Sequence, residues 1–157
     1  MPFWLKILVS VIAVEILGGL GAVFTTSSIE TWYAELTKPP GNPPNWLFAP
    51  VWTALYALIG IAFARVWHLG EAGPRKQAAM TWFTIQLVLN LAWTPVFFGA
   101  HQKLAALVII LTLVMTILLT MRAFARIDPL AAGLLCPYVL WVGYASYLNA
   151  GLWWLNR

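Results

Sequence analysis

Charged residues are scarce in this chain, with nine Lys and Arg and five Asp and Glu making up 9% of its 157 residues. A soluble domain of this size needs roughly a quarter of its residues charged to cover its surface. Because 62% of the residues are apolar and the mean hydropathy is +0.82, the composition excludes a soluble domain and a disordered chain. The net charge of +4 is scattered through loops without a basic stripe, which excludes a nucleic-acid partner. The partner that this composition predicts is a lipid bilayer.

Residues for metal binding and conventional catalysis are equally few. Cysteine occurs once, at Cys136, which excludes a disulfide within the chain; we expect a small, buried apolar side chain there. His68 and His101 fall in consecutive loops on opposite faces of the membrane, so they cannot bind a metal ion or a haem iron together. Neither a phosphate-binding loop nor a nucleophile elbow is present. The sequence therefore predicts no metal site and no required cofactor, and it leaves enzymatic activity undecided.

Long apolar runs, in contrast, are abundant. A spanning helix needs about 20 predominantly apolar residues, because a helix satisfies its own backbone polar groups in hydrocarbon. Five such runs occur, separated by segments that hold glycine, proline or charge. We predict an all-α, multi-pass membrane protein, in which a single domain (residues 1–157) is one bundle of five transmembrane helices at approximately 3–24, 46–67, 78–99, 104–123 and 129–153. Glu15 inside the first run argues against a cleaved signal peptide.

Basic residues are distributed unevenly between the two predicted faces of the bundle. With five crossings, the N-terminus, the second loop and the fourth loop share one face, which carries Lys6, Arg65, Arg75, Lys76, Arg122 and Arg126. The other face carries Lys38, Lys103 and Arg157. If the protein lies in an inner membrane, the positive-inside rule places the N-terminus and these two loops in the cytoplasm.

The first loop, residues 25–45, has a length that is typical of functional or disordered segments. Ser27 and Glu30 have the spacing of a capping box, which predicts a short helix after them, through Trp32. Four prolines between residues 39 and 44 favour a stiff, extended segment that turns at Gly41. The loop is either a rigid connector to the second helix or, because of its aromatic residues, a lid over a binding site.

Polar and aromatic side chains in the second, third and fifth helices recur at helical spacing, so that each helix presents them on one face. At 1.5 Å per residue, the outermost of them lie roughly 9 Å below the face that carries the first loop, and the others lie deeper. Such a group predicts a mostly apolar pocket with a few orienting donors, suited to a flat aromatic ligand or a sterol. The residues are Trp52, Tyr56, Gln86, Asn90, Trp93, Tyr138, Trp141 and Ala145.

Nine of the ten tryptophans divide into two groups by their position along the helices, and the tenth, Trp32, lies in the first loop. Those near helix ends are typical of the headgroup region, where amphipathic rings anchor a bundle. Three lie deeper, Trp52, Trp93 and Trp141, at the level of the predicted pocket. The tryptophans near helix ends are Trp4, Trp46, Trp67, Trp82, Trp153 and Trp154.

Glu15 is the one acid inside a predicted span. An intramembrane acid is a functional hypothesis by default, which keeps open a small transporter or proton-coupled channel centred on Glu15. The alternative is a protonated carboxyl bonded to a neighbouring helix. Gly18 and Ala22 follow at a spacing of small residues that favours close helix packing or dimerisation.

The ordered set of motifs resembles the translocator protein family, whose members are also called tryptophan-rich sensory protein or peripheral benzodiazepine receptor. The resemblance covers nearly the whole chain. It implies a five-helix bundle, often a homodimer, that binds porphyrins and haem-related tetrapyrroles as well as sterols or benzodiazepine-type ligands. The motifs are Trp32-Tyr33, Asn42-Pro43-Pro44, Pro50-Val51-Trp52-Thr53, Asn90-Leu91-Ala92-Trp93-Thr94-Pro95, Pro137-Tyr138 and Leu148-Asn149.

The resemblance implies a membrane receptor, sensor or carrier for tetrapyrroles, a hydrophobic small-molecule ligand bound in a pocket under the first loop. Some bacterial members promote light-dependent porphyrin breakdown, in which Trp52 and Trp141 would be the catalytic residues. This chain departs from the family at Glu15, where small or apolar residues are usual. It also has no basic residue between Tyr147 and Arg157, so the cholesterol-recognition pattern is absent. The implied ligand-binding residues are Trp32, Trp52, Tyr56, Asn90, Trp93, Tyr138, Trp141 and Ala145.

Overall fold

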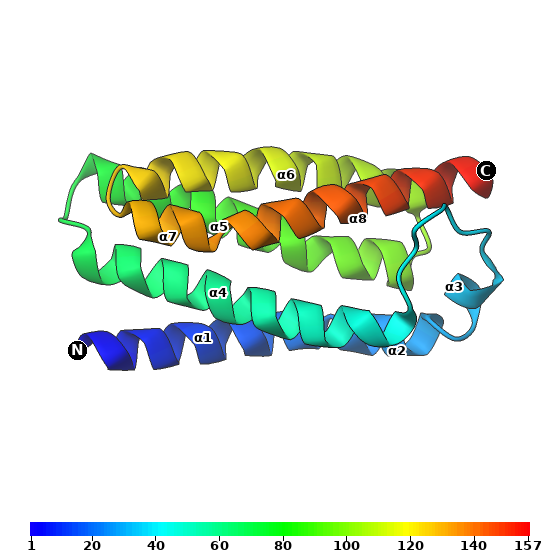
Figure 1. The fold of residues 1–157 in the computed structure, drawn as a ribbon, viewed down its shortest axis with the longest axis horizontal. Helices are drawn as coiled ribbons and strands as arrows, with labels where there is room; N and C mark the ends of the chain where they lie inside the picture. The colour runs from blue at the N-terminus through cyan, green and yellow to red at the C-terminus, as the bar shows by residue number, and fades with distance from the viewer.

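The computed structural model describes residues 1–157, and every regular element in it is a helix. Five helical segments are long and apolar enough to cross a membrane: Phe3–Ser28, Asn45–Leu69, Pro74–Gly99, Lys103–Ala125 and Pro129–Leu155. The predicted all-α fold with five transmembrane helices is therefore confirmed. The N-terminus and the C-terminus lie at opposite ends of the long axis (Figure 1), as an odd number of crossings requires.

The first and last spans each consist of two helices. The first contains α1 (Phe3–Leu20) and α2 (Ala22–Ser28), which meet at Gly21, and the last contains α7 (Pro129–Leu134) and α8 (Cys136–Leu155). The second span is α4 (Phe48–Leu69), preceded by the 3-10 turn η1 (Asn45–Leu47). The third is α5 (Pro74–Thr94), which continues into the π-helical turn η2 (Pro95–Gly99), and the fourth is the unbroken α6 (Lys103–Ala125).

Prolines account for the irregular stretches of the third and fifth spans. A proline inside a helix removes one backbone donor and its ring clashes with the preceding turn. Pro95 begins η2, where the helix widens into a π turn. Pro137 lies in the first turn of α8, directly after the break at Leu135. Both prolines therefore coincide with an irregular stretch of helix.

The spans pack in the order first, second, fifth, fourth and third around the bundle, and the third returns to the first. Along this ring the first span changes its neighbour. Its first half, α1, packs closely on α4, and a Cβ atom added at Gly60 would lie 2.6 Å from the Val11 Cα. Its second half, α2, packs mainly on η2. The helices therefore separate on the side where α2 has left α4.

The segment between the first two spans differs from the prediction at its start. Helix α2 extends to Ser28, so the connection covers residues 29–44 rather than 25–45. The predicted capping box is wrong, because the Ser27 hydroxyl donates to the Phe24 carbonyl at 2.9 Å, inside a helix that is ending. The short helix expected through Trp32 is present as α3 (Trp32–Glu35).

The outside of the bundle is apolar, as a lipid-facing surface requires. Exposed side chains follow the outer face of α1 and also occur on α6 and α8. Cys136 belongs to this surface, so the expectation of a buried cysteine is wrong. The large apolar side chains exposed on α1 are Trp4, Leu8, Val9, Ile12, Ile16, Leu17 and Leu20.

Candidate ligand-binding site

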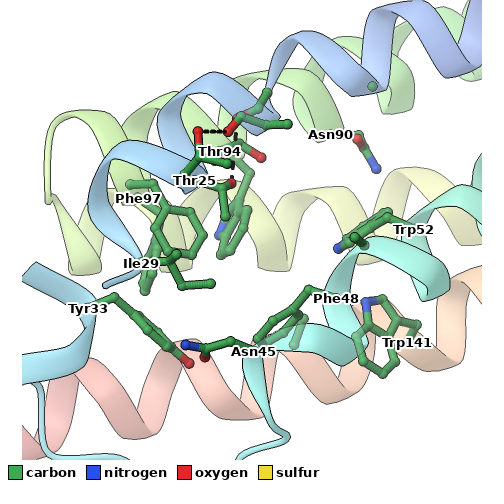
Figure 2. A pocket seen from close by; sticks show the side chains of 18 of the residues that line it. Thr25, Ile29, Tyr33, Asn45, Phe48, Trp52, Asn90, Thr94, Phe97 and Trp141 are labelled. Carbon is green, nitrogen blue, oxygen red and sulfur yellow. Dashed lines mark hydrogen bonds between the residues drawn. The ribbon is translucent and has the colours of Figure 1, made fainter. Parts of the chain in front are cut away.

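A cavity of about 660 Å³ lies where α2 has separated from α4, with walls from α1, α2, α4, α5, η2, α6 and α8. Its lining is predominantly apolar, and its volume is within the range of sites that bury a small organic ligand. Trp52 and Trp141 extend toward this space from α4 and α8, and Phe97, Ile29 and Tyr33 lie across it (Figure 2). The cavity therefore occupies the half of the bundle nearest the first loop.

Most of the sequence-predicted ligand-binding residues line this cavity. They are Trp52, Tyr56, Asn90, Trp93, Trp141 and Ala145. Two others do not line it, which corrects the placement expected for them. Tyr138 is fully buried in the core behind the cavity, where its ring makes an edge contact with Trp52. Trp32 lies outside it, stacked on His101 with ring centroids 4.1 Å apart.

Tyr138 instead belongs to a network of side-chain hydrogen bonds that links α4, α5 and α8 at the inner end of the cavity. The Tyr56 hydroxyl donates to the Asn90 Oδ1 at 3.1 Å, and the Asn90 Nδ2 donates to the Tyr138 hydroxyl at 2.8 Å. The Tyr138 hydroxyl in turn donates to the Gln86 Oε1 at 2.8 Å. Buried polar groups of this kind need partners, and this network of hydrogen bonds fixes the orientation of Tyr56 and Asn90 toward the cavity.

The three interior indoles differ in how their N–H groups are used. The Trp93 Nε1 donates to the Asn149 Oδ1 at 2.9 Å, and the Asn149 Nδ2 donates to the Lys103 carbonyl at 2.9 Å. Trp93 also stacks on Phe97, so it is held on both sides. No hydrogen bond within the chain involves the indole nitrogens of Trp52 and Trp141, and neither of them is a fully buried unsatisfied atom. These two indoles can donate to a ligand.

One wall of the cavity was missed by sequence reasoning. Gly18, Ala22, Thr25 and Ile29 line it from α1, α2 and the residue that follows. Their spacing of i, i+4, i+7 and i+11 is that of one helical face, and this signal was present in the sequence. The predicted first loop began at residue 25, so the helical face that continues to Ile29 was divided between a helix and a loop.

The first loop begins at the end of the cavity, where Ile29, Glu30 and Tyr33 line it, and is then fastened to α8. It crosses from α3 to the C-terminal end of α8 before it returns to α4 (Figure 1). Thr37 and Asn156 exchange two hydrogen bonds, each 2.8 Å long. The Tyr147 hydroxyl donates to the Pro40 carbonyl at 2.8 Å, and the Tyr144 hydroxyl donates to the Gly41 carbonyl. The predicted turn is present at Gly41, whose φ of +82° favours glycine.

Tyr33 connects this loop to the cavity. Its buried ring contacts Phe98, and its hydroxyl donates to the Asn42 Oδ1 at 3.1 Å. Burial of the ring raises the pKa of the Tyr33 phenol above its ordinary value. Lys38 holds the same turn, because its Nζ donates to the Tyr33 carbonyl at 3.0 Å and lies over the ring.

The charge of the cavity wall has one sign. Glu15 and Glu30 are the charged residues that line it, and no lysine, arginine or histidine does. Glu30 is exposed near the loop end, whereas Glu15 lies near the middle of the first span. His68 and His101 lie at opposite ends of the helical bundle, as predicted. The chain contains no group of three side chains that could hold a metal ion.

A family model described as the TspO/MBR family matches residues 9–155, nearly the whole chain. The chain belongs to this family. This confirms the family resemblance that the tryptophan and proline motifs indicate, and it places the cavity in a membrane protein of the TspO/MBR group.

Similar proteins within the family come from distant organisms. A tryptophan-rich protein TspO of Chlorobaculum tepidum is 45% identical over 139 residues, which is 88% of each chain. The TspO of Archaeoglobus fulgidus is 43% identical over 152 residues, 97% of each chain. A translocator protein of Bos taurus is 39% identical over 143 residues, which covers 90% of this chain and 85% of the bovine one.

Proposed function

We propose that this TspO/MBR member is a membrane receptor, sensor or carrier that binds a flat hydrophobic ligand of the tetrapyrrole class in the cavity beneath the first loop. The observation that carries the proposal is the cavity itself, about 660 Å³ in volume and apolar, with two indole N–H groups free to donate. Stacking on aromatic faces together with a few donors suits a planar ring system. Sterols and benzodiazepine-type ligands would compete for the same space.

Titration of protoporphyrin IX into the detergent-solubilised protein tests this proposal, with tryptophan fluorescence as the readout. We expect saturable quenching. Trp141→Phe and Asn90→Ala should each weaken binding about tenfold. Trp141→Phe removes a free donor, and Asn90→Ala removes the hydrogen bond that orients Tyr56. Trp154→Phe is the matched control, since Trp154 is exposed on the outside of the bundle. Equal affinity in all three variants would reject this cavity as the site.

Light-dependent breakdown of the bound porphyrin is a second candidate function, with Trp52 and Trp141 as the catalytic residues. It is favoured by their unused indole N–H groups, which leave both rings open to a ligand, whereas Trp93 is bonded to Asn149. Under illumination with porphyrin in air, we expect loss of the porphyrin absorbance faster than without protein. Trp52→Phe should abolish the acceleration and Trp93→Phe should retain part of it. Breakdown at the rate of free porphyrin would reject this activity.

A transporter or channel centred on Glu15 has less support. Toward the N-terminal end, the path beyond Glu15 is filled by the close packing of α1 on α4, where Val14 and Ile59 are buried and Gly60 approaches Val11. A cavity with a packed inner end suits binding better than conduction.

The homodimer implied by the family resemblance is also kept as a proposal, for which the exposed apolar face of α1 is a suitable surface.

A further inference from the structure

The Glu15 carboxyl lines the cavity without a partner of its own. The chain's salt bridge joins Arg65 to Asp128, at the N-terminal end of the bundle. No hydrogen bond within the chain reaches the Glu15 carboxyl. Its neighbour Tyr56 is not available as a donor, because the hydroxyl already donates to Asn90. A carboxyl near the middle of a membrane therefore faces a ligand-sized space with nothing to neutralise it.

The side chains around Glu15 do not supply a positive charge either. From α4, α5 and α8, the cavity is lined by aromatic, aliphatic, threonine and asparagine side chains. The nearest lysines of the loop end are used elsewhere: Lys38 binds carbonyl groups of the first loop, and Lys103 lies over the Trp32 ring outside the cavity. The second acid of the lining, Glu30, adds charge of the same sign.

Desolvation makes this arrangement selective. An ionised carboxylate in a low-dielectric site is strongly unfavourable unless it is paired. A ligand cation at hydrogen-bonding distance would supply the pair, and charge-assisted hydrogen bonds are about twice as strong as neutral ones. A ligand carboxylate at the same place would repel Glu15 or force one of the two groups to take up a proton.

We infer that Glu15 makes this cavity charge-selective, so that its preferred ligand is an apolar ring system that carries a protonated amine, bound with the ammonium group at Glu15. Ligands with carboxylates bind more weakly, with their acidic groups turned away from the inner end. The inference rests on the proposed function, because it assumes that the cavity is the ligand site, and it specifies the charge of the ligand group that lies at Glu15.

Three porphyrins with the same ring test the inference: protoporphyrin IX as the diacid, its dimethyl ester, and its bis(dimethylaminoethyl) amide. For the unaltered protein we expect affinity to rise in that order, with the amine tenfold or more above the ester. Glu15→Gln, which is nearly isosteric, should remove the preference for the amine and raise the affinity for the diacid. Glu15→Asp should retain part of the preference. Glu30→Gln is the matched control at the exposed end of the lining, and it should change the order little.

The outcomes separate this inference from the proposed function. If all three porphyrins bind, Trp141→Phe weakens them, and Glu15→Gln leaves their order unchanged, the cavity is the site but Glu15 is a neutral structural carboxyl and the inference is overturned. If Trp141→Phe and Asn90→Ala have no effect on any of them, the proposed function fails first. Thermal unfolding of each variant shows whether a loss of binding reflects a loss of fold.

Discussion

At the scale of single residues, Asp128 shows how much one side chain supports at the N-terminal end of the bundle. Its carboxylate accepts from the backbone N–H groups of Leu130 and Ala131, which caps α7. The same carboxylate accepts from the Arg65 Nε at 2.5 Å, which ties α4 to α7. The Arg65 guanidinium and these N–H groups hold the pKa of Asp128 below its ordinary value.

Substitutions at Asp128 should separate the cap from the ion pair. Asp128→Asn retains a capping oxygen and removes the charge, so we expect a small loss of stability, of about 0.2–1 kcal/mol. Asp128→Ala removes both and should cost about 1 kcal/mol more. Thermal unfolding in detergent measures the order, with exposed Glu71→Gln as control. Equal melting temperatures for the two Asp128 variants would contradict a capping role.

The same lowered pKa gives the pH dependence a definite sign. A carboxyl whose pKa is lower in the folded state contributes stability at pH values above its unfolded pKa, about 3.9. That contribution is lost as the pH falls through the lower, folded value. The difference in stability between the unaltered protein and Asp128→Asn should therefore be constant near neutral pH and shrink in acid below about pH 4.

At the scale of elements, the first loop is packed against α8. Pro39 is buried against Gly151, where an added Cβ would lie 2.6 Å from the Pro39 Cβ. The loop is fixed there by contact with a helix that also contributes Trp141 and Ala145 to the cavity. Movement of the loop and release of a ligand should therefore be coupled at Gly151.

Gly151→Ala should loosen the loop without filling the cavity. The new methyl group must displace Pro39, so we expect faster amide hydrogen exchange in residues 36–42 and several-fold faster ligand dissociation. Gly143→Ala is the matched control on the same helix, because an added Cβ there meets no atom within 4 Å. Unchanged exchange in Gly151→Ala would show that the loop does not depend on this contact.

The elements also show what sequence could and could not predict. Five apolar runs sufficed for the spans, because bilayer thickness and backbone hydrogen bonding leave few alternatives. The end of the first span was missed because Thr25, Thr26 and Ser27 are polar. Their hydroxyls donate to carbonyls of the preceding helical turn, as for Thr26 to Ala22 at 2.9 Å. Polar residues whose hydroxyls bond to the preceding helical turn can continue a helix beyond the end of its apolar run.

The candidate site was predictable to the extent that it follows single-helix patterns. Trp52, Tyr56, Asn90 and Trp141 were found from spacing and depth, and all four line the cavity. Trp32 was not placed correctly, because its position depends on a stack with His101 from a loop that is distant in sequence. Which loops meet is decided by the order of helices around the bundle, and a single sequence does not contain that order explicitly.

At the scale of the whole molecule, the alternation of the spans fixes which loops share a face. The first loop, the loop at His101 and the C-terminus lie at one end, and the cavity lies in that half. The distribution of lysine and arginine is the basis on which the orientation of the bundle in a cell is predicted. The prediction remains that, if the protein lies in an inner membrane, the N-terminus and the second and fourth loops are cytoplasmic.

Cysteine labelling in intact cells measures this orientation. Cys136 is first replaced by Ala, and single cysteines are then placed at Glu71 in the second loop and Glu35 in the first loop, both of which are exposed. An impermeant maleimide should label the Glu35→Cys variant in intact cells and the Glu71→Cys variant only after permeabilisation. The reverse pattern would show that the bundle is inverted in its membrane.

The change of neighbour along the first span has a consequence for how the cavity is encoded. Half of this span is fixed against α4 at Val11, whereas the other half and the residue that follows it present Thr25 and Ile29 to the ligand space. Each residue turns a helix by about 100°. The number of residues between the two halves therefore sets whether Thr25 and Ile29 face the ligand or the lipid. An insertion or deletion of one residue near Gly21, where α1 and α2 meet, would therefore rotate this wall of the binding site away from the ligand.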